Sequence, residues 1–352
     1  MTMWVAFLAI LAGCARVPPE PPSVTILCYH NFGDKKRAYS VPVDRFKEEM
    51  RFLSVQKIPV IPLRALEDYL YKKSPLPDRS VVITIDDGYQ SAKGIAWPVF
   101  RRYGYPFTLF VYPHAVGRYS SALTWDDLRL MARQGVDIQS HSMTHPLLTH
   151  PGKPMNRKDY HAWIEEELAG SKRRIEMELQ QPVTSIAYPY GGYDQYIVER
   201  TRAVGYRSAF TCDDGDVAGF TDPYRLNRRL VFRQTSLKAF VTSLSERPLP
   251  VTALSPADGE RVKDIPIKIR ARILNVGNIL PESAQILVDK VGRHWMPAPV
   301  DPKTGEMTFD VPPSVTRRGY YFVSLTAKDR ANPTLLREAS WLFIVRKNIS
   351  KK

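Results

Sequence analysis

Short apolar runs alternate with helical stretches from Val24 to about residue 245, and this alternation constrains the fold more than any other feature of the chain. Strands joined by helices run parallel, and the number of repeats favours a closed or nearly closed (β/α) barrel. We expect strands at 24–28, 81–85, 107–111, 136–139, 184–187 and 207–211, with a weaker one at 60–61. Plausible helices lie at 44–55, 65–72, 125–134 and 159–179.

The pattern changes after Leu244. Arg247, Pro248 and Pro250 break the helical texture, and no long helical pattern follows. Alternating segments predict antiparallel strands at 265–273, 284–289, 306–311, 320–329 and 340–345. We therefore expect a barrel over residues 24–247 and an Ig-like or fibronectin-like β-sandwich over 251–347. The sandwich could be a spacer or could bind a polymer or a partner.

The pattern at the N-terminus predicts a targeting signal. The apolar stretch from Trp4 to Ala12 is too short to span a bilayer and ends in L-A-G-C at Cys14. This end resembles a bacterial lipobox, which implies a signal peptide over residues 1–14 and acylation of Cys14. An uncleaved apolar N-terminus is the alternative. Residues 15–23 are rich in proline and predict an extended linker between a lipid anchor and the barrel.

Net charge limits the kinds of binding partner to expect, and cysteine content bears on whether the fold contains disulfides. Lys and Arg total 50 against 36 Asp and Glu, and the net charge of +14 suits an acidic partner such as nucleic acid, anionic lipid or a charged wall polymer. The charge is spread out, and we find no phosphate-binding Gly-rich loop or zinc-finger spacing, so nucleic acid is not expected. Cys28 and Cys212 favour buried free thiols over a single disulfide.

Two segments predict a metal-dependent hydrolase. T-I-D-D-G at 84–88 follows an apolar run, and H-S-M-T-H lies at 141–145. Adjacent carboxylates at the end of a buried strand are costly unless a cation or a shared proton relieves them. Imidazoles at positions i and i+4 converge if the segment is helical or a tight turn. An ordinary Asp-Gly turn at Gly88 is the alternative for the acidic pair.

Catalytic metal sites keep three protein ligands and an open position for water, and Asp87, His141 and His145 meet this requirement. We expect Zn²⁺, with Co²⁺ or Ni²⁺ as alternatives. Asp86 would then lie beside the water and act as the general base.

The motifs resemble those of a known family. T-I-D-D-G at 84–88, H-S-M-T-H at 141–145 and Y-P-Y-G at 188–191 are similar to the motifs of the polysaccharide deacetylases of carbohydrate esterase family four, the NodB-homology group. C-Y-H at 28–30 and D-P-Y-R-L at 222–226 resemble the branch that acts on N-acetylglucosamine polymers of biofilms or envelopes. The match covers roughly residues 24–245.

The resemblance implies a distorted (β/α) barrel and removal of N-acetyl groups. It also implies that Asp86 is the base and that Asp87, His141 and His145 hold the metal. The backbone N–H of Tyr190 would face the developing oxyanion.

The chain departs from the family pattern in two places. Ala187 occupies the position of the arginine that steadies the base, and Arg228 is our candidate to replace that arginine, with an ordinary surface arginine as the alternative. The late histidine that protonates the leaving amine is also missing. For the acid we consider His30 first, then His114 and His150; alternatively, Asp86 returns the proton itself.

Further residues are candidates for substrate binding. Tyr89 and Trp125 could offer ring faces to sugars, or they could be packing residues. Pro189 and Tyr190 belong to the same expected surface. The hydroxyls of Ser142 and Thr144, inside the second motif, would hold their own loop.

Together these patterns predict a monomeric, metal-dependent hydrolase that removes N-acetyl groups from an N-acetylglucosamine polysaccharide. The lipobox implies export and anchoring in a bacterial cell envelope, in the periplasm or on the outer surface. Two alternatives stay open: a polysaccharide-binding envelope lipoprotein with weak or lost catalysis, and an esterase that removes O-acetyl groups at the same metal site.

Overall fold

The computed structural model describes residues 21–33, 36–263, 266–289, 294–312 and 319–345. The signal peptide expected over 1–14, its lipobox Cys14 and most of the linker at 15–23 lie outside these residues. Within the described ranges, no helix combines the length and the apolar character needed to cross a bilayer.

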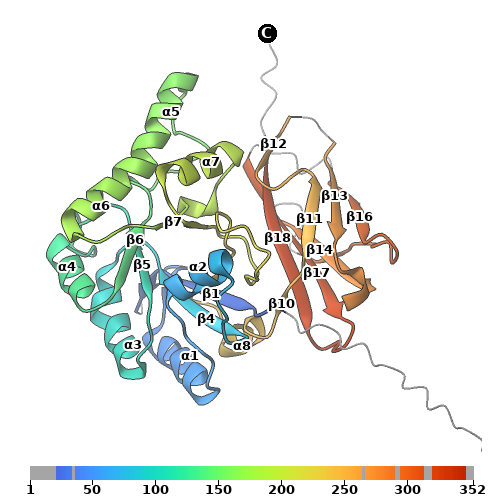
Figure 1. Ribbon diagram of the computed structural model, residues 1–352, viewed down its shortest axis with the longest axis horizontal. Coiled ribbons are helices and arrows are strands. Elements are labelled where there is room, and N and C mark those ends of the chain that lie inside the picture. Colours follow the sequence, from blue (N-terminus) through green and yellow to red (C-terminus); the bar gives the residue numbers. More distant parts are fainter. Residues whose placement is uncertain (1–20, 34–35, 264–265, 290–293, 313–318, 346–352) are drawn as a thin grey trace, which may run out of the picture.

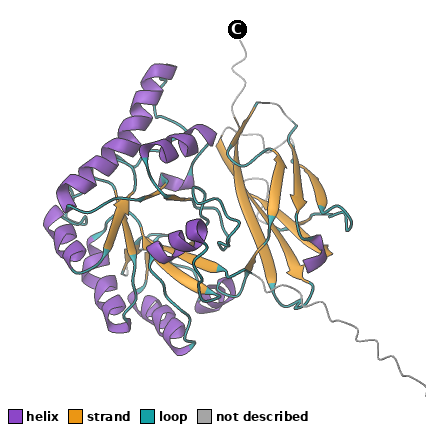
Figure 2. Ribbon diagram, in the orientation of Figure 1, coloured by secondary structure: helices purple, strands orange, loops and turns teal. Residues whose placement is uncertain are grey.

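The first region, which we call the barrel region (residues 24–244), is built on a parallel sheet, as the alternation predicts (Figures 1 and 2). The sheet has the strand order β8-β7-β6-β5-β4-β1-β9. Its strands are β1 (Val24–Tyr29), β4 (Ser80–Ile85), β5 (Thr108–Val111), β6 (Asp137–Ser140), β7 (Ser185–Ala187), β8 (Ser208–Phe210) and β9 (Arg229–Leu230). The weaker strand expected at 60–61 is only an isolated bridge between Val60 and Val81.

The two outer strands of this sheet are joined through Leu226. The Leu226 N–H donates to Ala209 O in β8, and its carbonyl accepts from Thr211 N, both at 2.9 Å. A few residues later, β9 pairs with β1, with Leu27 opposite Arg229. The segment from Leu226 to β9 therefore connects both edges of the sheet.

Helices surround the sheet on its outer side (Figure 1). They are α1 (Val43–Val55), α3 (Trp97–Tyr103), α4 (Trp125–Arg133), α5 (Arg157–Glu165), α6 (Ser171–Leu179), α7 (Gln195–Val204) and α8 (Leu237–Ser243). The helix expected at 159–179 is α5 and α6 joined by a π-helical turn, η2 (Glu166–Gly170). A second π-helical turn, η1 (Ala92–Ala96), leads into α3. Thr124 and Asp127 form the capping box of α4.

Both faces of the sheet are buried, which explains why its strands read as continuous apolar runs. In β1, Leu27 and Tyr29 face the larger core that the outer helices cover. Val24 and Ile26 face a smaller inner core, which α2 (Leu63–Lys72) closes.

In the second region, which we call the β region (residues 247–345), the described residues form strands and loops apart from a short 3₁₀ turn, η4 (Val276–Asn278). One sheet has the order β10-β18-β17-β14-β15, with β12 also paired to β18, and the other has the order β11-β13-β16. The strands are β10 (Arg247–Pro248), β11 (Val251–Ser255), β12 (Glu260–Val262), β13 (Lys268–Ile273), β14 (Ile279–Val288), β15 (Met296–Pro297), β16 (Glu306–Asp310), β17 (Gly319–Asp329) and β18 (Leu336–Val345).

Both sheets contribute side chains to one shared core. Most pairs are antiparallel, as expected, but β10 and β12 run parallel to β18. The Ig-like or fibronectin-like topology stays a prediction.

Candidate active site

Acidic residues and histidines meet where the parallel strands end. Asp86 and Asp87 follow β4 directly, and His141 follows β6. The D-D-G segment is also a turn, because Asp87 and Gly88 have φ angles of 73° and 70°. A Cβ atom on Gly88 would lie 3.2 Å from Val111. The segment is therefore a turn and a candidate functional site at once, since the turn directs the two carboxylates.

Three side chains form a group that could hold a metal ion: Asp87, His141 and His145. Asp87 Oδ1 lies 3.3 Å from His145 Nε2 and 3.7 Å from His141 Nε2. The two imidazole rings are 4.6 Å apart and nearly perpendicular. The i, i+4 spacing acts here through a tight loop, in which Ser142 and His145 have φ angles of 63° and 60°.

The charge states of this group suit a cation. The second ring nitrogen of His141, Nδ1, lies 2.7 Å from Ala187 O, which leaves Nε2 directed at the carboxylates. Burial lowers the pKa of His141 to about 3 and lowers that of His145, so both imidazoles are neutral. Burial and the nearby Asp86 raise the pKa of Asp87 to about 6. Neutral imidazoles and a carboxylate are the donors that zinc takes, and a cation would relieve the carboxylate pair.

The histidine loop is held by Glu167, a residue that the sequence patterns do not single out. Glu167 is buried in the π-helical turn η2 and accepts from Met143 N at 3.0 Å and from Thr144 N at 2.9 Å. Its other oxygen accepts from the Thr144 hydroxyl at 2.6 Å, and His145 N donates to Ser142 Oγ at 3.1 Å. Ser142 and Thr144 thus hold their loop, as expected. A buried Glu in a helical pattern gives no signal in the sequence.

Asp86 is bound by Arg228. The guanidinium donates to Asp86 Oδ1 at 2.9 Å and to Oδ2 at 2.8 Å, and its Nε donates to Thr211 O at 2.9 Å. Arg228 has no solvent exposure, and its guanidinium lies 5.9 Å from the ring centre of Phe110 and 6.0 Å from that of Phe210. The nearby Arg228 guanidinium overcomes the opposing effect of burial and holds the pKa of Asp86 well below its usual range. Arg228 is therefore not a surface residue, and Asp86 is ionised.

Cys28 and His30 form a second group of possible ligands around Asp86. Together with Asp86 they offer three ligand atoms within 4.8 Å of one another. Arg228 already engages both Asp86 oxygens, and burial raises the pKa of the Cys28 thiol, so a cation would meet a positive charge and a neutral thiol there. Cys28 and Cys212 are both free thiols.

Of the three histidines considered as the acid, only His30 lies beside the aspartates. Burial lowers its pKa, so it is neutral. His114 is exposed and contacts Arg118, and His150 is exposed after the histidine loop. Neither His114 nor His150 belongs to the two donor groups found among the described residues.

The Y-P-Y-G segment forms a tight turn, η3 (Pro189–Gly191), after β7. Tyr190 has a φ of 58°, and its ring, 63% exposed, stacks edge-on to His145 at 4.8 Å. Pro189, the first residue of this turn, is buried. Gly191 must be glycine, because a Cβ atom there would lie 2.5 Å from Cys212 Cβ. Tyr190 thus borders the metal group through its contact with His145.

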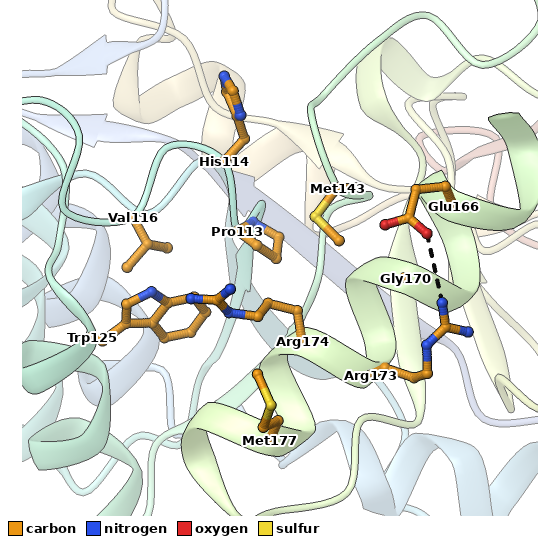
Figure 3. Close-up of a pocket in the computed structure, with 10 residues that line it drawn as sticks. All are labelled: Pro113, His114, Val116, Trp125, Met143, Glu166, Gly170, Arg173, Arg174 and Met177. Atoms are coloured by element: carbon orange, nitrogen blue, oxygen red, sulfur yellow. Dashed lines mark ion pairs between the residues drawn. The ribbon is translucent and has the colours of Figure 1, made fainter.

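Tyr89 and Trp125 have different surroundings. Tyr89 lies close enough to the Asp87 carboxylate to influence the pKa of that group, so Tyr89 belongs to the metal group's surroundings. Trp125 instead lines a groove of about 640 Å³ (Figure 3). The Arg174 guanidinium lies 5.6 Å from the centre of the Trp125 ring. The groove borders the histidine loop, because Met143 also lines it, along with Pro113, His114, Val116, Glu166, Gly170, Arg173 and Met177.

Comparisons with known proteins agree with this geometry. Residues 73–209, which contain all three motifs, match the family model for polysaccharide deacetylase. A poly-β-1,6-N-acetyl-D-glucosamine N-deacetylase from Staphylococcus epidermidis is 27% identical over 244 residues, which are 66% of this chain and 80% of that protein.

Solved structures show the same fold in the barrel region. The Streptococcus pyogenes deacetylase PplD, in complex with acetate, has a TM-score of 0.57 at 20% identity and covers 64% of this chain and 99% of its own. IcaB from Ammonifex degensii has a TM-score of 0.56 at 24% identity, with 63% and 96% covered. These structures show the fold, and the family-model match identifies residues 73–209 as a polysaccharide deacetylase domain; deacetylases of this kind are hydrolases that act on amide bonds.

Proposed function

We propose that this protein is a metal-dependent N-deacetylase that acts on an N-acetylglucosamine-containing polysaccharide. The observation that carries the proposal is the convergence of Asp86, Asp87, His141 and His145 at one end of the parallel sheet. The relative from S. epidermidis is named for deacetylation of such a polymer. The acetate in the PplD complex is the acid product that deacetylation would release.

Asp87, His141 and His145 would hold a divalent ion, and their nitrogen and oxygen donors favour Zn²⁺. When bound, such an ion acts as a Lewis acid toward the acetamide carbonyl and lowers the pKa of water.

Asp86 takes the proton of the attacking water. Arg228 keeps this carboxylate ionised and fixes both of its oxygens. The water oxygen bonds to the acetyl carbon, and the backbone N–H of Tyr190 donates to the oxyanion that forms there. The C–N bond then breaks, and the amine needs a proton. Asp86 returns the proton it took, or neutral His30, next to Asp86, relays it.

The Trp125 groove suits sugars that flank the reacting one. An indole face packs against the C–H surface of a pyranose, and Arg173 and Glu166, paired at 3.6 Å, lie at the groove wall (Figure 3). Because the groove adjoins Met143 of the histidine loop, a polymer bound in it could pass directly to the metal group. Tyr89 and Tyr190 would contact the reacting sugar, whereas Pro189 is buried and would support the Tyr190 turn.

The lipobox supports a location in the cell envelope. We propose that Cys14 is acylated and that residues 15–23 link the anchor to a monomeric enzyme with a barrel at 24–247 and an Ig-like sandwich at 251–347. Incorporation of a labelled fatty acid, lost in Cys14→Ser, tests the anchor.

Acetate release from a poly-β-1,6-N-acetylglucosamine oligomer tests the activity. We expect release that a chelator abolishes and Zn²⁺ restores, and that Asp87→Ala removes at an unchanged melting temperature. The matched control is Asp44→Ala, which removes an exposed carboxylate on α1.

Three outcomes would argue against the proposal. Release retained in Asp87→Ala would remove Asp87 from the metal group. Polymer binding without release, over several metals, would favour a binding protein. Release only from O-acetylated substrates would favour an esterase.

A further inference from the structure

Strand β18 of the β region contributes side chains to the core of the barrel region. Along β18, Leu342 and Ile344 belong to the core of the barrel region, whereas Phe343 and Val345 belong to the core of the β region. This division follows from the alternation of side chains along a strand. Figure 1 places β18 on the side of the β region that faces the barrel. The two regions are therefore packed through a common element and not merely joined by a linker.

The β region reaches the residues that follow the Tyr190 turn. Arg261, in β12, donates from Nε to Asp194 Oδ2 at 2.7 Å and from Nη2 to Thr149 O at 3.2 Å. Asp194 is buried and caps the N-terminus of α7, where it accepts from Ile197 N at 2.9 Å. The Arg261 guanidinium thus fixes the junction between the Tyr190 turn and helix α7.

Two tyrosines hold the residues between Tyr190 and Asp194. A Cβ atom on Gly192 would lie 2.7 Å from the Tyr320 hydroxyl, so β17 packs directly on the turn. The buried Tyr193 hydroxyl lies 2.6 Å from Asp258 Oδ1, in the β region. Gly192 and Tyr193 are therefore both covered by the β region.

The same tyrosine extends the connection to Arg228. Its hydroxyl also lies 2.8 Å from Asp213 Oδ2, and Arg228 N donates to Asp213 O at 3.0 Å. Arg229, the residue after Arg228, donates to Glu338 in β18 at 2.5 Å. The β region thus contacts the supports of both the Tyr190 turn and the arginine that holds Asp86.

These contacts are more than a spacer needs. Buried ion pairs gain little net stability over apolar packing, but they demand one geometry, because a displaced partner leaves a buried charge. Interfaces between independent domains are by default small and mobile. Buried Asp194, Arg229 and Glu338 at this interface therefore indicate a fixed arrangement.

We propose that the β region is a fixed part of the catalytic apparatus, in which Arg261 and Tyr320 position the turn that carries Tyr190. The effect on turnover rests on the proposed deacetylase function, because it assumes that the Tyr190 N–H binds the oxyanion. The effect on the turn does not depend on that function.

The test compares Arg261→Met with Arg261→Lys and with Arg272→Met in the full chain. Arg272 forms an exposed pair with Glu306 within the β region and is the matched control. We expect Arg261→Met to lower kcat about ten- to a hundredfold with little change in KM, because a misplaced donor weakens the transition state and not substrate binding. Arg261→Lys should recover part of the loss, and Arg272→Met should match the wild type.

Hydrogen exchange of the peptide 188–194 gives a readout without activity. Its amides should exchange faster in Arg261→Met than in the wild type or Arg272→Met. Tyr320→Phe, a milder change at the same turn, replaces Arg261→Met if that variant does not fold.

The outcomes separate the two proposals. Unchanged exchange in folded Arg261→Met or Tyr320→Phe would overturn the positioning role, as would faster exchange with an unchanged kcat. No acetate release from the wild type, together with faster exchange in the variant, would refute the deacetylase function while leaving the positioning of the turn supported.

Discussion

Arg228→Met removes the partner of a buried carboxylate while keeping much of the side-chain volume. In the wild type, both side chains are at least 98% buried, and two hydrogen bonds of 2.8 and 2.9 Å join them. Removing one partner of such a pair leaves an uncompensated charge and costs about 3–5 kcal/mol. For a domain of this size, that loss lowers the melting temperature by roughly 6–20 °C.

The loss should depend on pH. In the wild type, the Arg228 guanidinium keeps the pKa of Asp86 below its value in the unfolded chain, so Asp86 is ionised in both states above about pH 5 and adds no slope there. In Arg228→Met, burial alone would raise that pKa above the unfolded value of about 3.9. The folded state then binds the extra proton, and stability falls as pH rises from about 4 toward the new pKa.

Urea unfolding with a chelator, at about pH 5 and about pH 7.5, measures both effects. The variant should lose more stability at the higher pH. Asp86→Asn and the double variant complete a thermodynamic cycle, and Arg272→Met, an exposed arginine, should cost at most about 1 kcal/mol. A coupling between Arg228 and Asp86 below about 0.5 kcal/mol, or equal losses at both pH values, would refute the reasoning.

Three further predictions follow from the site and its supports. Glu167→Ala removes the hydrogen bonds that hold the histidine loop and should weaken Zn²⁺ binding about 10- to 100-fold by calorimetry; unchanged affinity would contradict this role. Gly191→Ala should prevent folding, because its Cβ meets Cys212 backbone and Cβ, whereas Gly104→Ala, with a similar φ and open space, should cost only about 1 kcal/mol in urea unfolding; similar costs would refute the steric argument. Burial and the neighbouring Asp258 raise the pKa of Asp213, so the folded state keeps a proton there and stability falls as pH rises above about 4, the unfolded pKa; Asp213→Asn should flatten that fall, and an unaltered slope would exclude Asp213 as its source.

Much of the barrel region was predictable because its signals are local. A strand buried on both faces, such as β4 with the sequence S-V-V-I-T-I, reads as a short apolar run. Asp87 and His141 follow strand ends, where parallel sheets collect their functional side chains. The chemical identity of these side chains then indicates a metal site, since imidazole and carboxylate groups are metal ligands.

The supports of the site were not predictable to the same degree. Arg228 lies 142 residues from Asp86, and the sequence left an ordinary surface arginine as its alternative. Glu167 gave no signal, because a charged residue in a helical pattern is usually solvated. Trp125 and Tyr89 were grouped as sugar platforms, yet the structure places Trp125 in a groove and Tyr89 near the Asp87 carboxylate.

By itself, the sequence determined the types of elements, their order and the donors at the strand ends, because these depend on residues a few positions apart. The tertiary structure decided which distant groups surround each donor and how each is charged. The apolar end of β18, W-L-F-I-V, illustrates the difference: its composition predicts burial on both faces, but only the packed chain assigns one face to each core. Burial and Coulomb interactions act through space, so they are fixed only when the chain is folded.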